Sequence, residues 1–175
     1  MGIRKCIILK VFILSVALFI LTGCGGTAMN VRNTVNNFSR LLEVGNLENL
    51  TLTIHYVEPH FITRIPLSAD SLIRMAEANK VVVHGNMLIE HIDLLKQLNV
   101  DILIPVEQGS SLNARLVYTL EWGNDNMLIV AMGINDSVFV NEFEVEFNYV
   151  FSDIIRPFLA EESLEKLAIF FRQDM

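Results

Sequence analysis

Residues 112–133, LNARLVYTLEWGNDNMLIVAMG, decide the fold that this sequence predicts. Every even-numbered position in residues 112–122 is apolar and most odd-numbered positions are polar, which is the period-two pattern of a β-strand. Residues 123–126, GNDN, are a strong turn signal, and residues 127–132 are apolar throughout. Such a continuous apolar run predicts a central strand covered on both faces. The side chains expected on one face of the first strand are Leu112, Ala114, Leu116, Tyr118, Leu120 and Trp122.

The next predicted strand, residues 137–147, changes its parity partway along. Its apolar side chains lie first at even positions, Val138 and Val140, and then at odd positions from Phe143 onward. Because a one-residue slip moves side chains to the other face of a sheet, we expect either a bulge or a tight two-residue turn at Asn141 and Glu142. Residues 112–147 are therefore predicted to form an antiparallel β-meander.

A helix, a strand and a second helix are expected upstream of the meander. Residues 29–43 carry one apolar helical stripe, and residues 50–57 (LTLTIHYV) have the β-branched, alternating composition of a strand. Ser68 is the expected N-cap of a helix that ends near residue 78, with Asp70 in its first turn. The stripe of the first helix consists of Val31, Val35, Phe38 and Leu42.

The remaining elements complete an α+β pattern. Residues 80–84 (KVVVH) predict a short buried strand, residues 87–98 a helix, and residues 101–105 (DILIP) another strand. Two C-terminal helices are expected at residues 149–158 and 161–172. The predicted class is α+β: an N-terminal helix, a mixed helix and strand first half, the meander and two final helices. The absence of an internal repeat or a linker favours one domain, residues 30–175.

The first 26 residues form a separate unit of sequence. Arg4 and Lys5 precede an apolar run at residues 11–21, and residues 21–24 are Leu-Thr-Gly-Cys. A basic start, an apolar run and a small residue before a cleavage point are the layout of a secretory signal. The four-residue box resembles that of bacterial lipoproteins. The resemblance implies cleavage after Gly23 and a thioether-linked diacylglycerol on Cys24, the first residue of the mature chain.

This resemblance implies a signal peptide at residues 1–23, a lipidated tether at residues 24–29 and the domain after it. Two acyl chains hold a protein stably on a bilayer, so we expect it on the cell membrane, facing outside the cytoplasm. The alternative is an uncleaved signal anchor, whose apolar run of residues 6–23 contains Lys10 and is marginal for a span of about 20 residues. The mature region faintly resembles small lipoproteins of unassigned function, and this resemblance gives no activity to carry over to the chain.

The net charge of the mature chain limits the classes of partner that it is expected to bind. Loss of three of the 13 basic residues with the signal, while all 20 acidic residues remain, leaves a formal charge of −10. This charge disfavours nucleic acid and anionic lipid head groups as partners, and it is compatible with cationic partners or metal cations. Cys6 would leave with the signal and Cys24 would carry the lipid. No thiol then remains for a disulfide, a zinc site or a nucleophile, and we predict no cofactor.

A serine hydrolase is one alternative that the sequence leaves open. Ser110 and Ser111 lie in a glycine loop, and His84 or His91 could serve as the base. Asp93 or Asp101 would then orient the imidazole, as nucleophilic catalysis by serine requires. However, no G-x-S-x-G motif follows a predicted strand, so we predict no catalytic residue and treat the serines as a turn.

Cation sites are a second alternative. His55, Glu58 and His60 could ligate a metal ion only if the chain folds back at Pro59, because a strand directs His55 and Glu58 to opposite faces. Another candidate is the row of carboxylates formed by Glu142, Glu144 and Glu146, and a third is the loop at residues 124–126. Like charges on a strand more often protect an edge, so we predict no metal site.

The sequence therefore favours a non-catalytic binding or interaction module, anchored to the membrane through Cys24. Its partner would be an unidentified protein or small molecule. The two alternatives are a hydrolase of the cell envelope that uses Ser110 or Ser111 with a histidine, and a structural or assembly factor of the envelope.

Overall fold

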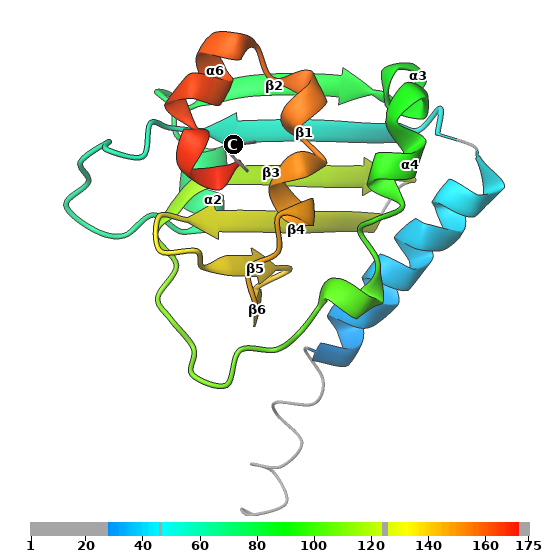
Figure 1. Ribbon diagram of the computed structural model, residues 1–175, viewed down its shortest axis with the longest axis horizontal. Coiled ribbons are helices and arrows are strands. Elements are labelled where there is room, and N and C mark those ends of the chain that lie inside the picture. The colour runs from blue at the N-terminus through cyan, green and yellow to red at the C-terminus, as the bar shows by residue number, and fades with distance from the viewer. Residues whose placement is uncertain (1–27, 46, 124–125, 172–175) are drawn as a thin grey trace, which may run out of the picture.

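The protein is a mixed α/β structure built on a six-stranded antiparallel sheet, seen in a computed structural model that describes residues 28–45, 47–123 and 126–171 (Figure 1). Across the sheet the strand order is β2-β1-β3-β4-β5-β6. The strands are β1 (Leu50–Tyr56), β2 (Asn79–His84), β3 (Ala114–Trp122), β4 (Asn126–Gly133), β5 (Val138–Val140) and β6 (Phe143–Val145).

The predicted meander is confirmed, because β3, β4, β5 and β6 are consecutive antiparallel neighbours. Of the two alternatives at Asn141 and Glu142, the structure contains the tight turn. Both residues have positive φ angles, 44° and 67°, and Val140 pairs directly with Phe143 across them. Positive φ at both central residues matches the right-handed twist of a hairpin, which explains the change of parity in the sequence.

The start of the first meander strand differs from the expected pattern. The β3–β4 register shifts between Ala114 and Leu116, so Ala114 packs on the opposite face of the sheet from Leu116. Leu112 packs on that opposite face as well. Arg115, expected on a polar face, is buried at the shift. The shift is stabilised by Val57, whose N–H donates to the Arg115 carbonyl at 2.9 Å.

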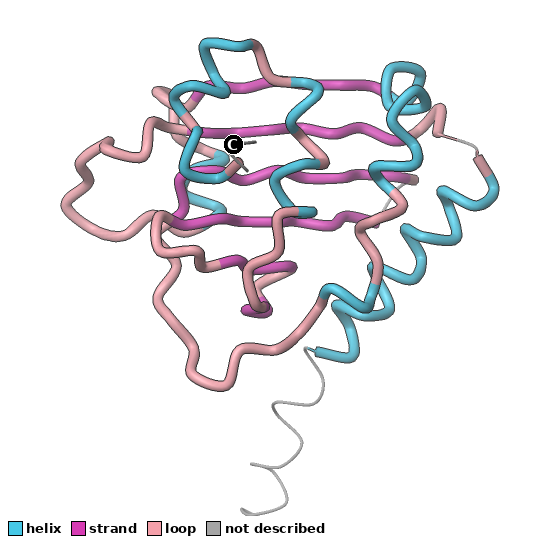
Figure 2. The backbone as a smooth tube through the Cα atoms, viewed as in Figure 1, coloured by secondary structure: helices cyan, strands magenta, loops and turns pink. Residues whose placement is uncertain are grey.

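The predicted N-terminal helix spans residues 28–44 in the described part of the chain, and its whole apolar stripe is buried. The other helices are shorter than expected, as the cyan segments of the tube in Figure 2 show. Each of them except α2 is followed along the chain by a 3-10 turn. Glycine at position 85 is required, since a Cβ there would collide with the carbonyl of Leu47. The helices are α2 (Ala69–Ile73), α3 (Gly85–Leu88), α4 (Ile92–Leu95), α5 (Val150–Asp153) and α6 (Glu161–Lys166). The 3-10 turns are Ile89–His91, Val100–Ile102, Arg156–Phe158 and Ala168–Phe170.

Two strand predictions upstream of the meander need correction. The segment expected as a strand at residues 101–105 begins instead with the 3-10 turn Val100–Ile102, because the Asn99 side chain accepts from the Asp101 N–H at 2.9 Å and caps it. Only Pro105 makes a bridge, to Val145. The strand expected to be buried at residues 80–84 is the edge strand β2, and most of its side chains are exposed.

The main core lies between one face of the sheet and the helices in front of it. In Figure 1, α4, the orange α5 and α6 cross this face, and the N-terminal helix packs beside them. Val130, at the centre of β4, pairs with Tyr118 and Val140 and is fully buried, as predicted. The Tyr118 hydroxyl is buried without a hydrogen-bond partner among the described residues. Burial therefore raises the pKa of Tyr118.

The rear face of the sheet is covered only in part, so the prediction that β4 is covered on both faces is only partly right. The short helix α2 lies behind the sheet in Figure 1, and its Leu72 packs over Val117 and Ala131. The Ser68 side chain caps this helix as predicted, accepting from the Ser71 N–H at 3.1 Å. Beyond α2, Met127 and other side chains of the rear face are exposed. The uncovered region provides the setting for a candidate binding site.

Candidate functional site

A pocket of about 270 Å³ lies beside the first residues of α2, where the rear face of the sheet becomes exposed. We call it the α2 pocket. Its floor is formed by the row of side chains that β4 and β5 direct to the rear face, in which Ala131 is paired with Phe139. The small side chain of Ala131 leaves a hollow between larger neighbours. The complete lining is Ser68, Ala69, Asp70, Leu112, Ile129, Ala131, Phe139 and Glu142.

The rim of the α2 pocket carries two carboxylates. Asp70 lies in the first turn of α2 and accepts from Arg74 at 3.0 Å, an exposed pair. Glu142 is exposed in the β5–β6 turn, which Asn141 fastens to β4 by accepting from the Ile129 N–H at 2.7 Å. An apolar floor with carboxylates at its edge can hold a ligand that has an apolar body and a positive charge.

Two other hollows lie at the far end of the N-terminal helix. The larger, about 600 Å³, is more open than the α2 pocket, and its lining is Val44, Gly45, Leu47, Glu48, His84, Gly85, Asn86 and Ile89. The second, about 440 Å³, includes Arg40 and Trp122. Neither gathers a set of groups suited to catalysis, and an open hollow removes less of a ligand from water than an enclosed one.

The residues of the hydrolase hypothesis are not brought together. Ser110 meets Glu144: its N–H donates to the carboxylate at 2.7 Å, and its hydroxyl donates to the other oxygen. His84 lies at the end of β2, with its Nδ1 3.5 Å from the Thr51 hydroxyl. The ring of His91 packs edge-on against Phe158, with ring centroids 5.1 Å apart. In Figure 1 the loop that precedes β3 runs below the sheet, away from α3 and α4.

The other residues of that hypothesis are dispersed too. Ser111, Asp93 and Asp101 are exposed. Asp93 lies within 3.6 Å of Lys96, which is its neighbour along the same helix. No histidine is hydrogen-bonded to either serine among the described residues. A base adjacent to the nucleophile is the requirement for activation of serine, and the observed partner of Ser110 is a carboxylate instead.

The three carboxylates expected as a row on one strand face occupy three different settings. Glu142 is in the hairpin turn, because the chain reverses there. Glu144 lies on β6 and is bound to Ser110, and exposed Glu146 follows the strand, with its N–H donating to the Ile104 carbonyl at 2.8 Å. The row is therefore divided by the same turn that changes the parity of the sequence.

The histidine set near Pro59 is dispersed as well. His55 is buried on β1, where burial and then the charge of Lys80 lower its pKa. His60 is exposed in the following loop, and Glu58 lies 3.6 Å from Lys166. Within the described residues no three metal-ligating side chains of the His, Cys, Asp and Glu types come together. The predicted lipidation and cleavage residues Cys24 and Gly23, and the loop positions Asn124 and Asp125, lie outside the described residues.

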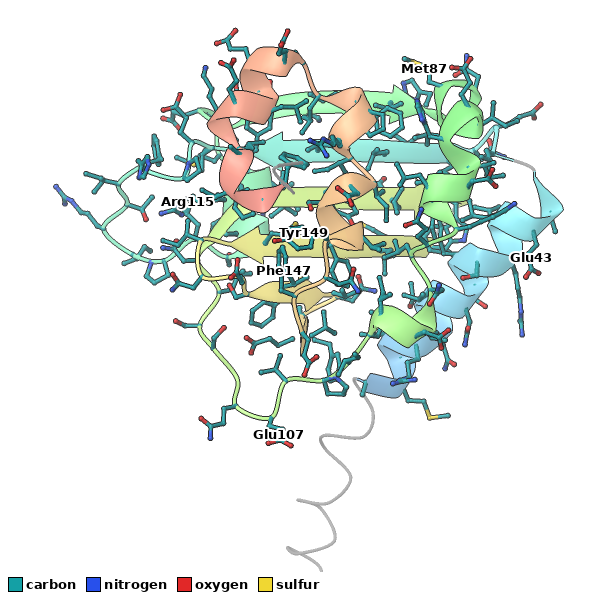
Figure 3. The ribbon with its side chains drawn as sticks, viewed as in Figure 1. Glu43, Met87, Glu107, Arg115, Phe147 and Tyr149 are labelled. Atoms are coloured by element: carbon teal, nitrogen blue, oxygen red, sulfur yellow. The ribbon has the colours of Figure 1, made fainter. Side chains whose placement is uncertain are left out.

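One residue that the sequence assigned to a polar strand face proves to organise a loop. Arg115 as a whole residue is only 4% exposed, and its guanidinium donates to the carbonyls of Pro59 and Phe61 at 3.3 and 3.1 Å. It also donates to the Asn113 side chain and the Ala114 carbonyl, at 2.7 and 2.9 Å. Figure 3 places Arg115 at the base of the loop that leaves β1. Burial lowers its pKa. A lone arginine in an alternating strand gave no signal of this role.

Comparison of the chain with models of protein families, with curated proteins and with solved structures finds no match. In the part of the chain that the structure describes, none of the helices has the length and apolar character needed to cross a bilayer.

Proposed function

We propose that this chain is a membrane-anchored α+β lipoprotein that acts as a binding module outside the cytoplasm. Cys24 carries the lipid, residues 24–29 form the tether, and the N-terminal helix connects the tether to the sheet. The anchor is supported by the sequence: a basic start, an apolar run and the Leu-Thr-Gly-Cys box at residues 21–24 coincide.

The binding role is carried by one observation, the α2 pocket with its apolar floor and acidic rim. Its ligand has an apolar body and a cationic group, either as a free amine or as a side chain of a partner protein. The body would cover Ile129, Ala131 and Phe139, and the cation would lie near Glu142 and Asp70. The acidic character of the mature chain would attract the same ligands over a longer range.

The test is a titration followed by NMR of the methyl groups of Ile129 and Ala131. Phenethylamine is the cationic probe, and 2-phenylethanol is its neutral counterpart of similar size. We expect the amine to shift these signals at concentrations at which the alcohol does not. Glu142→Gln should weaken the amine several-fold, whereas Glu146→Gln, an exposed carboxylate outside the pocket, should not.

Equal shifts with both probes, or equal effects of the two substitutions, would remove the argument for a cation at this rim. No shift with either probe would remove the pocket from consideration as the binding site.

A further inference from the structure

The loop between β1 and α2 carries unusually exposed apolar side chains. Ile62 is 93% exposed, Ile65 is 73% exposed and Phe61 is 36% exposed. All three lie within residues 59–66 (PHFITRIP), which we call the apolar loop. Single exposed apolar residues are ordinary on protein surfaces, but several at one projecting loop mark an interaction surface. Figure 1 shows this loop projecting from the left end of the sheet.

The structure holds the apolar loop at both of its ends. Arg115 binds the carbonyls of Pro59 and Phe61, and the Phe61 N–H donates to the Glu58 carbonyl at 2.9 Å. At the other end, the Leu67 N–H donates to the Asn113 side chain at 3.1 Å. The buried guanidinium therefore fixes the base of the loop while its isoleucines point away from the core. A buried charged group thus holds in place a loop whose apolar side chains are exposed to solvent.

The charge of the apolar loop distinguishes it from the rest of the domain. Residues 59–66 contain His60 and Arg64 and no acidic residue, although the mature chain carries twice as many acidic as basic side chains. Apolar side chains next to a cation suit the boundary between lipid head groups and acyl chains, where the apolar groups are buried and the cation meets phosphate.

The proposed anchor would hold the start of the N-terminal helix near a bilayer. Only residues 25–27 separate Cys24 from the first described helical residue, so a lipid on Cys24 would keep the domain close to the membrane surface. The helix runs from this point to Val44, about 24 Å away at 1.5 Å per residue. In Figure 1 the Val44 end of the helix lies at the right of the molecule and the apolar loop at the left.

We propose that the apolar loop inserts Ile62 and Ile65 into the bilayer that holds the lipid anchor, with Arg64 at the phosphate level. This inference rests on the proposed anchoring. It assigns the membrane a second point of attachment, which would fix the orientation of the domain and hence the direction in which the α2 pocket faces.

The experiment uses the full, processed protein in phosphatidylcholine vesicles, with and without phosphatidylglycerol. An environment-sensitive fluorophore is attached to Ile62→Cys, or to the control Val44→Cys. Val44 is a matched control because it is apolar, 78% exposed and at the far end of the N-terminal helix. Lipids with a quenching group in the acyl chain report insertion. The wild-type chain is treated with the same fluorophore. If lipid blocks Cys24, the fluorophore cannot attach there, so the absence of labelling reports that the anchor exists.

We expect acyl-chain quenching to be several-fold stronger at position 62 than at position 44. The substitution Arg64→Glu should reduce it most in vesicles with phosphatidylglycerol, because the added charge is repelled by anionic head groups. Equal, weak quenching at both positions in an anchored protein would overturn the inference and leave the anchor intact. Labelling of the wild-type chain at Cys24 would overturn both proposals. A change at position 62 that needs no vesicles and grows with protein concentration would assign the loop to contact with a second copy and overturn insertion.

Discussion

Replacement of Arg115 by methionine tests the account of the loop most sharply. The guanidinium donates four hydrogen bonds at 2.7 to 3.3 Å while it is almost wholly buried. Hydrogen bonds to charged groups contribute about 1.5–3 kcal/mol each. Removal of the charge also removes a desolvation cost of several kcal/mol, and the carbonyls of Pro59 and Phe61 can reach water once the loop relaxes.

From these opposing contributions we expect Arg115→Met to lower the free energy of unfolding by about 2–3 kcal/mol, a large part of a typical total of about 5–15 kcal/mol. Urea denaturation measures this loss. Trypsin cleavage at Arg64 should become faster under native conditions, because the base of the loop is released. Arg115→Lys keeps the charge but cannot reach four acceptors, so its free energy of unfolding should lie between those of the wild type and Arg115→Met.

The matched control is Arg74→Met. Arg74 is an exposed arginine that pairs with Asp70 on the surface, and its replacement should change the free energy of unfolding by less than about 0.5 kcal/mol. If Arg115→Met behaved like this control in both denaturation and proteolysis, the buried guanidinium would not be what fixes the apolar loop, and the reasoning would be refuted.

Three further predictions concern the core and its response to pH. Val130→Asp should prevent folding, because an unpaired buried carboxylate costs several kcal/mol; retention of a cooperative urea transition would contradict this. Tyr118→Phe should raise the free energy of unfolding by about 1 kcal/mol, because it removes a buried hydroxyl that has no partner among the described residues; a loss of stability in urea would indicate a missing partner. Since burial and Lys80 lower the pKa of His55 in the folded state, the unfolded chain binds the proton more readily, so stability should fall as the pH drops below about 6.5. Denaturation series of wild type and His55→Gln between neutral and mildly acidic pH should differ in slope, and identical slopes would exclude this contribution.

The parts of the fold that depend on local pattern could be predicted from the sequence. The period-two alternation before Trp122 and the apolar run around Val130 specified β3 and β4, because each face of a strand must match its surroundings. The change of parity located an irregularity at Asn141, which could have been either a bulge or the β5–β6 turn that the structure contains. The apolar stripe around Phe38 specified the N-terminal helix in the same way.

The parts that depend on distant contacts could not be predicted. Nothing in the alternation of β3 indicates that Arg115 lies at a register shift or is buried. Its hydrogen-bond acceptors include the carbonyls of Pro59 and Phe61, which are far away in the sequence. The α2 pocket depends on where a five-residue helix begins near Ala131. The sequence therefore indicated most of the elements, whereas the candidate site emerges only from tertiary packing.

The most direct test of the central proposal is the intact mass of the protein isolated from the membranes of a bacterium that processes lipoproteins. We expect a chain that begins at Cys24 and carries the mass of a diacylglyceryl group, and a Cys24→Ala variant that remains unprocessed and unlipidated. A wild-type chain that retains residues 1–23, or one that ends its processing without lipid on Cys24, would contradict it.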